Sequence, residues 1–341
     1  FKQKTAYEML RSLVGSEMCI RDSYYSVLTL RPIKFMAISS YKVQDIPLKN
    51  TPLLMLKDFF ELTKARLAIS VVFSSLAGYL IAANSYDFSI IILLVVGGYC
   101  MVGASNSFNQ IIEKDLDALM DRTRNRPIPT GRVSVSVAFI ISVLLTLTGI
   151  VILYKINPKT ALFGAISIFI YTCLYTPLKT VTPLSVFVGA FPGAIPFMLG
   201  WVAATNNFGI EAGALFTIQF FWQFPHFWAL GWMLDEDYKK AGISMLPTKK
   251  KDKATALQTV LYTIWMIMIS IFPVSGLTGD LHLSVFSAIL IGIIGLVMLY
   301  FSVNLYTKMT TESAKNLFTA SVVCLTLVQI VYVIDKIYIW T

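Results

Sequence analysis

The chain has 341 residues, of which 56% are apolar and only 14% are charged, and its formal net charge is +9. This composition excludes a soluble domain of this length and predicts a polytopic membrane protein. The basic residues lie in short connections between apolar runs, so the positive charge indicates orientation and phosphate binding and gives no support to nucleic-acid binding.

The amino-terminal part divides into two segments. Residues 1–35 have weak periodicity, mixed charge and no apolar run long enough to span a bilayer, and they lack the plan of a signal peptide. We expect a non-homologous or disordered leader, or an upstream translation artefact, with Met36 as a more ordinary start. Residues 36–64 are expected to form a cytoplasmic segment, in which 54–66 make an amphipathic helix at the membrane interface.

Residues 65–341 are expected to form the intramembrane domain. Nine apolar stretches follow one another here, each near the roughly twenty residues that cross about 30 Å of hydrocarbon. All should be helices, because unpaired strand edges cannot be satisfied in lipid. We place them at roughly 65–83, 89–110, 133–154, 160–177, 183–204, 212–232, 255–275, 283–304 and 317–338.

The connections predict the orientation and an internal repeat. The connections after the second and sixth spans are rich in Arg and Lys, and those after the first, fifth and seventh contain neither. This asymmetry predicts a multi-pass protein of the cell (inner) membrane, with its amino end and both basic connections in the cytoplasm and its carboxyl end outside. Both basic connections also carry acids, four spans apart, which favours two four-helix pseudo-repeats around a cavity plus one appended helix.

Polar residues follow the second span at steps of three or four, which places them on one helix face. They are Asn106, Asn109, Glu113, Asp117 and Asp121. Carboxylates near a membrane are costly unless a cation neutralises them, and oxygen ligands without His or Cys favour magnesium that bridges to phosphate. Arg122 and Arg126 follow, and guanidinium groups match phosphate geometry. The alternative is a solvated, salt-bridged helix end.

Further candidates end the fourth and sixth spans. Asp235 and Asp237 form a second acidic cluster after the sixth span, and Tyr175 and Lys179 end the fourth. The Lys179 ammonium is expected to neutralise phosphate oxygens, although membrane orientation alone also favours a lysine at this position.

The sixth span contains the sequence WQFPHFW, which begins at Trp222 and holds His226. A lone histidine among aromatic residues is often simply packed and hydrogen-bonded. Its intramembrane position, before the second acidic cluster on the same helix, favours a substrate role.

Five segments occur in a fixed order: FNQIIEKDLDALMDRTRNRPIPTG, YTPLKTVTPLS, GAFPGAIPFMLGW, WQFPHFWAL and DYKKAGISMLP. They resemble signatures of the UbiA-type intramembrane prenyltransferases, and the last two resemble those of the protoheme IX farnesyltransferase branch. The resemblance covers about residue 55 to the end. It implies a nine-helix bundle that transfers farnesyl from farnesyl diphosphate to a vinyl group of heme B, giving heme O and pyrophosphate for terminal oxidases. Heme A synthase or oxidase assembly factors would be partners.

The resemblance also implies the site residues. The family's first motif, Asn-Asp-x-x-Asp-x-x-x-Asp, falls here on Asn109, Gln110, Glu113 and Asp117. Glu113 keeps the charge of the aspartate it replaces, and Gln110 does not. In the second motif Asp237 matches best, and Tyr238 stands where quinone-type relatives have aspartate. The magnesium ligands are therefore expected to be Asn109, Glu113, Asp117 and Asp237.

The remaining residues then have expected roles. Asp121 would act beside the magnesium ligands, and Arg122, Arg126 and Lys179 would neutralise the leaving group. The other substrate contacts would come from Asn106, Tyr175, Asp235 and Trp222. His226 would orient heme, through its iron or a propionate, or act as base for the water that quenches the last cation.

Two alternatives remain at this point. The prenyl acceptor could be a quinone precursor or a chlorophyll-type tetrapyrrole. Outside the enzymes, a transporter would share the internal repeat and the intramembrane acids, but its acids would lie in mid-span.

Overall fold

The computed structural model describes residues 52–339, and within this range it contains helices and no strand. The predicted all-α class is confirmed. The expectations for residues 1–35, and for the start of the segment 36–64, lie outside the described residues. The first described helix, α2 (Pro52–Thr63), occupies most of the stretch for which an interfacial helix is predicted.

The long helices follow the predicted order. They are α3 (Ala65–Ala82), α4 (Phe88–Ile112), α6 (Val135–Ile156), α7 (Pro158–Phe169), α9 (Ser185–Thr205), α10 (Ile210–Met233), α12 (Lys253–Ile271), α13 (Val285–Lys308) and α14 (Thr311–Ile339). α7 continues through a π-helical segment (Ile170–Tyr175) into α8 (Thr176–Leu178), and α12 ends in a 3-10 turn (Phe272–Ser275). Two short helices, α5 (Lys114–Leu119) and α11 (Asp235–Lys240), follow α4 and α10.

Eight of the described helical segments are long and apolar enough to cross a membrane. α10 is as long as they are but is not one of the eight, because polar side chains such as Gln219, Gln223 and His226 lower its hydropathy. The number nine therefore stays a prediction. The departure is informative, because a span that carries such residues needs polar partners inside the protein.

The helix boundaries follow from local sequence. Ser134, Asn157, Asp252 and Ser284 precede α6, α7, α12 and α13, and the side chain of each accepts a hydrogen bond from a backbone N–H in the first helical turn. Such caps satisfy donors that a helix start leaves without a partner.

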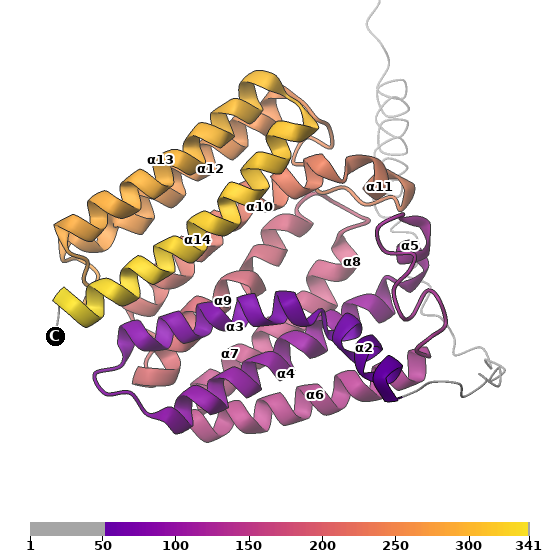
Figure 1. Ribbon diagram of the computed structural model, residues 1–341, viewed down its shortest axis with the longest axis horizontal. Helices are drawn as coiled ribbons and strands as arrows, with labels where there is room; N and C mark the ends of the chain where they lie inside the picture. The colour runs from indigo at the N-terminus through magenta and orange to yellow at the C-terminus, as the bar shows by residue number, and fades with distance from the viewer. Residues whose placement is uncertain (1–51, 340–341) are drawn as a thin grey trace, which may run out of the picture. The chain divides into compact units, whose positions relative to one another are not determined.

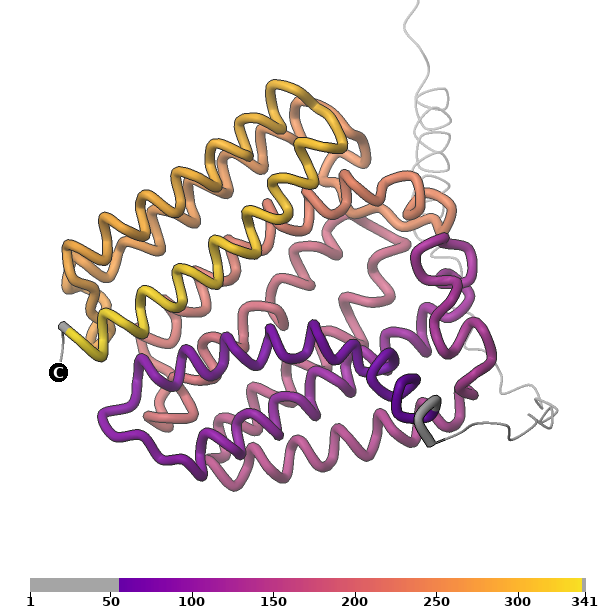
Figure 2. The backbone as a smooth tube through the Cα atoms, viewed as in Figure 1, coloured from indigo at the N-terminus to yellow at the C-terminus, as the bar shows by residue number. Residues whose placement is uncertain are grey.

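The long helices contact one another in chain order, and α14 returns to contact α3, which closes a ring; the tube in Figure 2 shows this path. Two further contacts cross the ring, α3 with α9 and α10 with α14. α3, α4, α6 and α7 repeat the neighbour order of α9, α10, α12 and α13, and a short helix follows the second member of each set. The two predicted four-helix pseudo-repeats are confirmed. α14 packs on α13 as α9 packs on α7.

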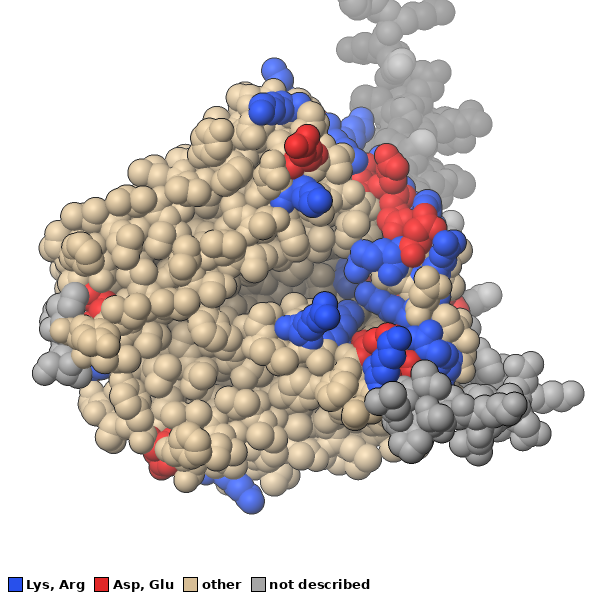
Figure 3. Space-filling view, viewed as in Figure 1, with Lys and Arg blue, Asp and Glu red and all other residues tan. Residues whose placement is uncertain are grey.

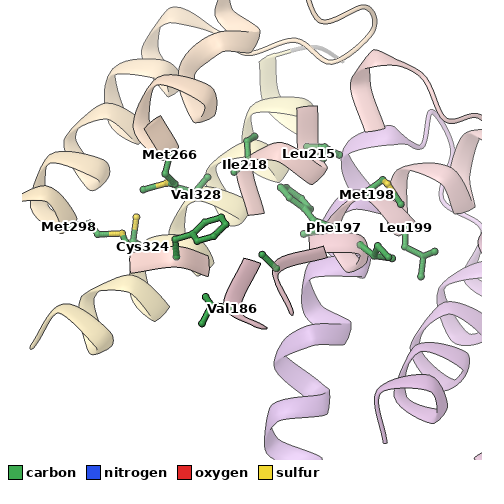
Figure 4. Packing of buried hydrophobic residues seen from close by; sticks show 14 of the residues in the cluster. Val186, Phe197, Met198, Leu199, Leu215, Ile218, Met266, Met298, Cys324 and Val328 are labelled. Atoms are coloured by element: carbon green, nitrogen blue, oxygen red, sulfur yellow. The ribbon is translucent and has the colours of Figure 1, made fainter. Parts of the chain in front are cut away.

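The core is centred on α9, which is the most buried of the eight apolar spans. Figure 4 shows Phe197 and Met198 of α9 with Leu215 and Ile218 of α10 in this core. The region of small residues and prolines in α9 makes close helix packing, one of the two outcomes that such a sequence favours. A Cβ atom added to Gly200 would lie 1.9 Å from the carbonyl oxygen of Ser75 in α3.

The first acidic stretch departs from one continuous helix. α4 ends at Ile112, Glu113 follows it with φ −93° and ψ 9°, and α5 ends at Leu119. The expectation that Asp121 continues the same helical face is therefore wrong. Asp121 lies in an exposed turn beyond α5, because the chain must turn here to reach α6.

Candidate active site

Charged side chains gather at the end of the bundle that carries α2, α5 and α11, while most of the remaining visible surface is uncharged (Figure 3). α5 and α11 lie side by side at this end (Figure 1), where a backbone N–H from the turn after α5 bonds to a side chain of α11. The space-filling view shows a hollow bordered by basic residues at this end. The two acidic connections therefore meet, as the pseudo-repeat predicts.

Asn109 lies at the centre of the cluster and connects three elements. Its Oδ1 accepts a hydrogen bond from Nζ of Lys64 at 3.2 Å, and its Nδ2 donates to Oγ1 of Thr176 at 3.3 Å. Lys64 adopts a left-handed conformation (φ 49°) between α2 and α3. Burial, together with the charges of Arg126 and Lys179, lowers the pKa of Lys64 to about 7, although the Glu113 and Asp117 carboxylates oppose this shift.

Glu113 and Lys179 form a buried ion pair between the end of α4 and the residue after α8. Oε1 of Glu113 lies 2.8 Å from Nζ of Lys179. The ammonium also lies 4.5 Å from the centre of the Tyr175 ring, a cation–π contact. Burial lowers the pKa of Lys179, but the Glu113 carboxylate outweighs this and leaves the pKa above its usual value.

Asp117, on α5, is fully buried and faces Arg126. Its Oδ2 accepts a hydrogen bond from Nη1 of Arg126 at 2.7 Å. Its other oxygen, Oδ1, is buried and has no hydrogen-bond partner within the described part of the chain. A buried carboxylate oxygen without a partner is costly, so this atom is a candidate ligand for a cation.

Asp237, on α11, binds the turn after α5. Its Oδ1 accepts the backbone N–H of Asp121 at 3.2 Å, and its Oδ2 accepts that of Arg122 at 3.1 Å. Partial burial raises the pKa of Asp237, but these bonds and the Lys240 ammonium together hold it below its usual value. Lys240 also pairs with Asp121, so one basic residue joins acids from the two pseudo-repeats.

The remaining predicted residues near this end have varied positions. Asn106 donates to the carbonyl of Thr63 at 3.0 Å, so it connects α4 to the end of α2. Gln110, at a changed position of the first motif, likewise donates to the carbonyl of Leu62 at 2.8 Å. Asp235 pairs with Lys239 at 2.8 Å, and the side chain of Arg122 is exposed.

His226 and Trp222 lie deeper, on the face of α10 that meets α14. Their rings stack with centroids 4.5 Å apart, and Nε1 of Trp222 donates to the carbonyl of Ser321 at 2.6 Å. Nδ1 of His226 lies 2.8 Å from Oγ of Ser321. The structure separates His226 from the charged cluster, because His226 lies seven residues, or about 10 Å, before the end of α10.

Magnesium fits the charged cluster in a bridging mode. Between residues 52 and 339, no three His, Cys, Asp or Glu side chains lie close enough to hold a metal ion together. Magnesium usually takes one or two protein carboxylates and completes its shell with water and substrate phosphates. Glu113, Asp117 and the amide oxygen of Asn109 suit this mode, and Oδ1 of Asp117 has no hydrogen-bond partner in the part of the chain that the structure describes.

Sequence reasoning missed three contributors to these clusters. Lys64 reads as a headgroup lysine, yet it contacts Asn109 across 45 residues. Thr176 carries no charge, and Ser321 lies in an unremarkable apolar run. Only the position of Thr176, beside Tyr175 in a motif already identified, gave a signal.

A model described as the UbiA prenyltransferase family matches residues 71–323. A protein from Flavobacterium psychrophilum called protoheme IX farnesyltransferase is 65% identical over 282 residues, which cover 82% of this chain and 94% of that protein.

Solved structures have the same fold. The structure of a UbiA homologue from Archaeoglobus fulgidus bound to DMAPP and Mg²⁺ has a TM-score of 0.64 at 14% identity, over 83% of this chain and 99% of that one. A structure described as digeranylgeranylglyceryl phosphate synthase has a TM-score of 0.69 at 20% identity, over 83% and 98%. The chain belongs to the UbiA prenyltransferase family.

Proposed function

We propose that this chain transfers the farnesyl group of farnesyl diphosphate to a vinyl group of heme B, which yields heme O and diphosphate. The main observation in support is the cluster in which Asp117 and Glu113 face Arg126 and Lys179, with Oδ1 of Asp117 buried and unpartnered among the described residues. The acceptor follows from the 65% identity to a protoheme IX farnesyltransferase over nearly its whole length.

The cluster provides both signs of charge that a metal-bound diphosphate requires. Glu113, Asp117 and Asn109 would hold Mg²⁺, which when bound neutralises the diphosphate and makes it a better leaving group. Lys179 is buried and Arg126 is partly buried beside the acids, so neither needs recruitment from solvent. Their donors would then turn from the carboxylates to phosphate oxygens. Lys64 would become a third cation, because an adjacent diphosphate favours the charged form of its ammonium group.

The transfer step breaks one C–O bond and forms one C–C bond, and the addition of water then forms a new C–O bond and breaks one O–H bond. The bond between farnesyl C1 and the bridging oxygen breaks, and its electron pair leaves with the diphosphate. The vinyl π electrons then bond the terminal vinyl carbon to C1, which leaves a cation on the carbon attached to the porphyrin ring. Water adds its oxygen to that carbon and releases a proton, which gives a hydroxyethyl group.

The surroundings of the cluster suit an allylic cation. Water in the wrong place would capture the farnesyl cation before the vinyl group does, so the chamber must exclude it. The deeper wall of the bundle is apolar and aromatic: Trp222, Phe227 and Phe318 surround His226. Aromatic faces also stabilise cations without attacking them.

We further propose that the chain lies in the cell inner membrane with the charged cluster on the cytoplasmic side. The support is that Lys and Arg concentrate in the connections at this end. Association with heme A synthase or oxidase assembly factors stays a prediction.

The test is product formation by the purified full chain in lipid nanodiscs with farnesyl diphosphate, heme B and Mg²⁺, followed by mass spectrometry. We expect farnesylated heme from the wild type and a loss of at least about 10²-fold in Asp117→Asn, because one anionic contact to a charge-bearing site is lost. Asp115→Asn is the matched control, since Asp115 lies exposed on the same short helix.

Three results would contradict the proposal. A product in which a quinone precursor and not heme carries the prenyl group would assign a different acceptor. Equal activity of Asp117→Asn and Asp115→Asn would show that farnesyl transfer does not depend on the charged cluster. Formation of farnesylated heme at undiminished rate without any divalent metal would remove the magnesium scheme.

A further inference from the structure

His226 is held on both faces and at one edge by residues far apart in the sequence. Its ring stacks on Trp222 at 4.5 Å and on Phe318 of α14 at 4.7 Å. Its Nδ1 lies 2.8 Å from Oγ of Ser321, also on α14. The Trp222 indole is fixed in turn by the backbone carbonyl of Ser321. Three contacts to α14 therefore fix the position and the plane of the imidazole.

The hydrogen bonds determine which nitrogen carries the proton. A serine hydroxyl has a single hydrogen. The carbonyl of Phe318 lies 2.6 Å from Oγ of Ser321 and can only accept, so a hydroxyl that donates to this carbonyl leaves the serine oxygen to accept from His226. In this arrangement Nδ1 of His226 is the N–H donor, and Nε2 of the neutral ring carries the lone pair.

Nε2 of His226 has no hydrogen-bond partner among residues 52–339, and the residue is only partly buried. The lone pair is therefore open to a ligand.

The side of α10 that carries His226 also carries two other polar residues, whose contacts show which way this side faces. Gln219 and Gln223 lie on the same side of the helix as His226, at spacings of seven and three residues. Gln223 donates to the carbonyl of Ala190 in α9, whereas His226 contacts α14, so this side of α10 lies between α9 and α14. Oε1 of Gln219 is buried there and has no hydrogen-bond partner between residues 52 and 339. The polar face of α10 is thus directed to the inside of the helix ring.

We infer that Ser321 is a positioning residue that holds His226 as its Nδ1–H tautomer, so that Nε2 ligates the iron of the tetrapyrrole acceptor. This inference rests on the proposed function. Imidazole nitrogen is a common axial ligand of heme iron, and a hydrogen bond from its other nitrogen to a neighbouring acceptor is the usual means of orienting it. The ligand would fix the porphyrin about 10 Å along α10 from the end that carries the charged cluster.

The experiment compares two probes on the purified full chain: ferric protoporphyrin IX (hemin) and metal-free protoporphyrin IX, titrated without farnesyl diphosphate. We expect hemin in the wild type to show the absorption spectrum of imidazole-bound iron. His226→Ala should lose this spectrum and bind hemin as weakly as the metal-free ring, while free imidazole should restore the spectrum. His282→Ala, which removes the other of the two histidines, is the matched control.

Ser321 is tested in the same titration. Ser321→Ala should weaken hemin binding by about ten- to a hundredfold, the usual effect of removing the partner of a metal-bound histidine. Its affinity for metal-free protoporphyrin IX should not change, because the indole of Trp222 still bonds to the backbone carbonyl. Ser321→Thr keeps the hydroxyl and should restore the wild-type affinity.

The outcomes separate this inference from the proposed function. Identical hemin spectra and affinities in wild type and His226→Ala would overturn iron ligation, even if the wild type makes farnesylated heme. An equal loss of affinity for both probes in Ser321→Ala would show a merely structural role and would overturn the positioning role. A wild type that binds hemin through His226 but transfers no farnesyl would contradict the proposed function alone.

Discussion

The ammonium of Lys179 lies 2.8 Å from Oε1 of Glu113, in a pair that is buried on both sides. The two residues are 66 positions apart and belong to the second and fourth spans of the first pseudo-repeat. The pair therefore places a cation beside an acid at the position where a metal-bound diphosphate would need both. It also fixes the end of α8 against the end of α4.

Replacement of Lys179 by Met should affect stability and activity together. The substitution leaves the Glu113 carboxylate buried without its counter-ion, which costs about 3 kcal/mol when a buried pair is broken from one side. We expect a lower unfolding midpoint in detergent, measured by tryptophan fluorescence against denaturant, and loss of farnesyl transfer. The double variant Lys179→Met with Glu113→Gln should recover the midpoint but not the activity. If the double variant does not recover the midpoint, the loss of stability in Lys179→Met does not come from breaking this ion pair.

Metal removal should change ligand binding without unfolding the protein. The acids at this site already have basic partners in the absence of a metal: Glu113 pairs with Lys179, and Asp117 with Arg126. We therefore expect EDTA to leave the unfolding temperature of the free protein unchanged. The further rise in that temperature caused by farnesyl diphosphate should require Mg²⁺, because a ligand that binds only the folded state stabilises it. A large drop in the unfolding temperature of the free protein on chelation would indicate a structural metal.

The contact of α3 with α9 should not tolerate a side chain at Gly200. A Cβ atom there would lie 1.9 Å from the Ser75 carbonyl oxygen and 2.4 Å from the backbone nitrogen of Tyr79, and backbone cannot move aside as a side chain can. We expect Gly200→Ala to abolish accumulation of folded protein, measured by fluorescence-detected size exclusion. Gly213→Ala is the control, since no atom of the described residues would lie within 4 Å of a Cβ at that position. Equal yields of the two variants would contradict this packing.

Asp252 should make a stability contribution that depends on pH. Its carboxylate caps α12 by accepting the backbone N–H of Thr255 at 2.8 Å and the hydroxyl of Thr248 at 2.9 Å, and these bonds hold its pKa below the usual value. A lowered folded-state pKa stabilises the protein above the unfolded-state pKa of about 4, and this is lost as pH falls through the folded value.

The corresponding experiment is thermal unfolding of Asp252→Ala and Asp252→Asn at neutral and acidic pH. At pH 7 the alanine variant should be less stable by about 1 kcal/mol, the usual value of a helix cap. The deficit should shrink toward pH 3. Asn keeps a capping oxygen but cannot titrate, so that variant should stay near the wild type at pH 7. A deficit of Asp252→Ala that is the same at both pH values would contradict the role of the charge.

The sequence by itself determined the class, the repeat and most of the residues of the charged cluster. Apolar runs near twenty residues can form little except spanning helices in lipid, and acids spaced by three or four residues must lie close on a helix. These constraints are local, so Asn109, Glu113 and Asp117 could be identified without knowing the fold. The placement of Asp121 failed for a tertiary reason, because α5 ends at Leu119 and the chain turns there to reach α6.

Only the tertiary structure decided which charges pair and which polar groups are left open. Lys64 reaches Asn109, and Ser321 reaches His226, across 45 and 95 positions. No spacing rule covers such distances, because they depend on which helices are neighbours in the ring. The tautomer of His226 is the clearest case: it is set by the Ser321 hydroxyl, which already gives its one hydrogen to a carbonyl within α14.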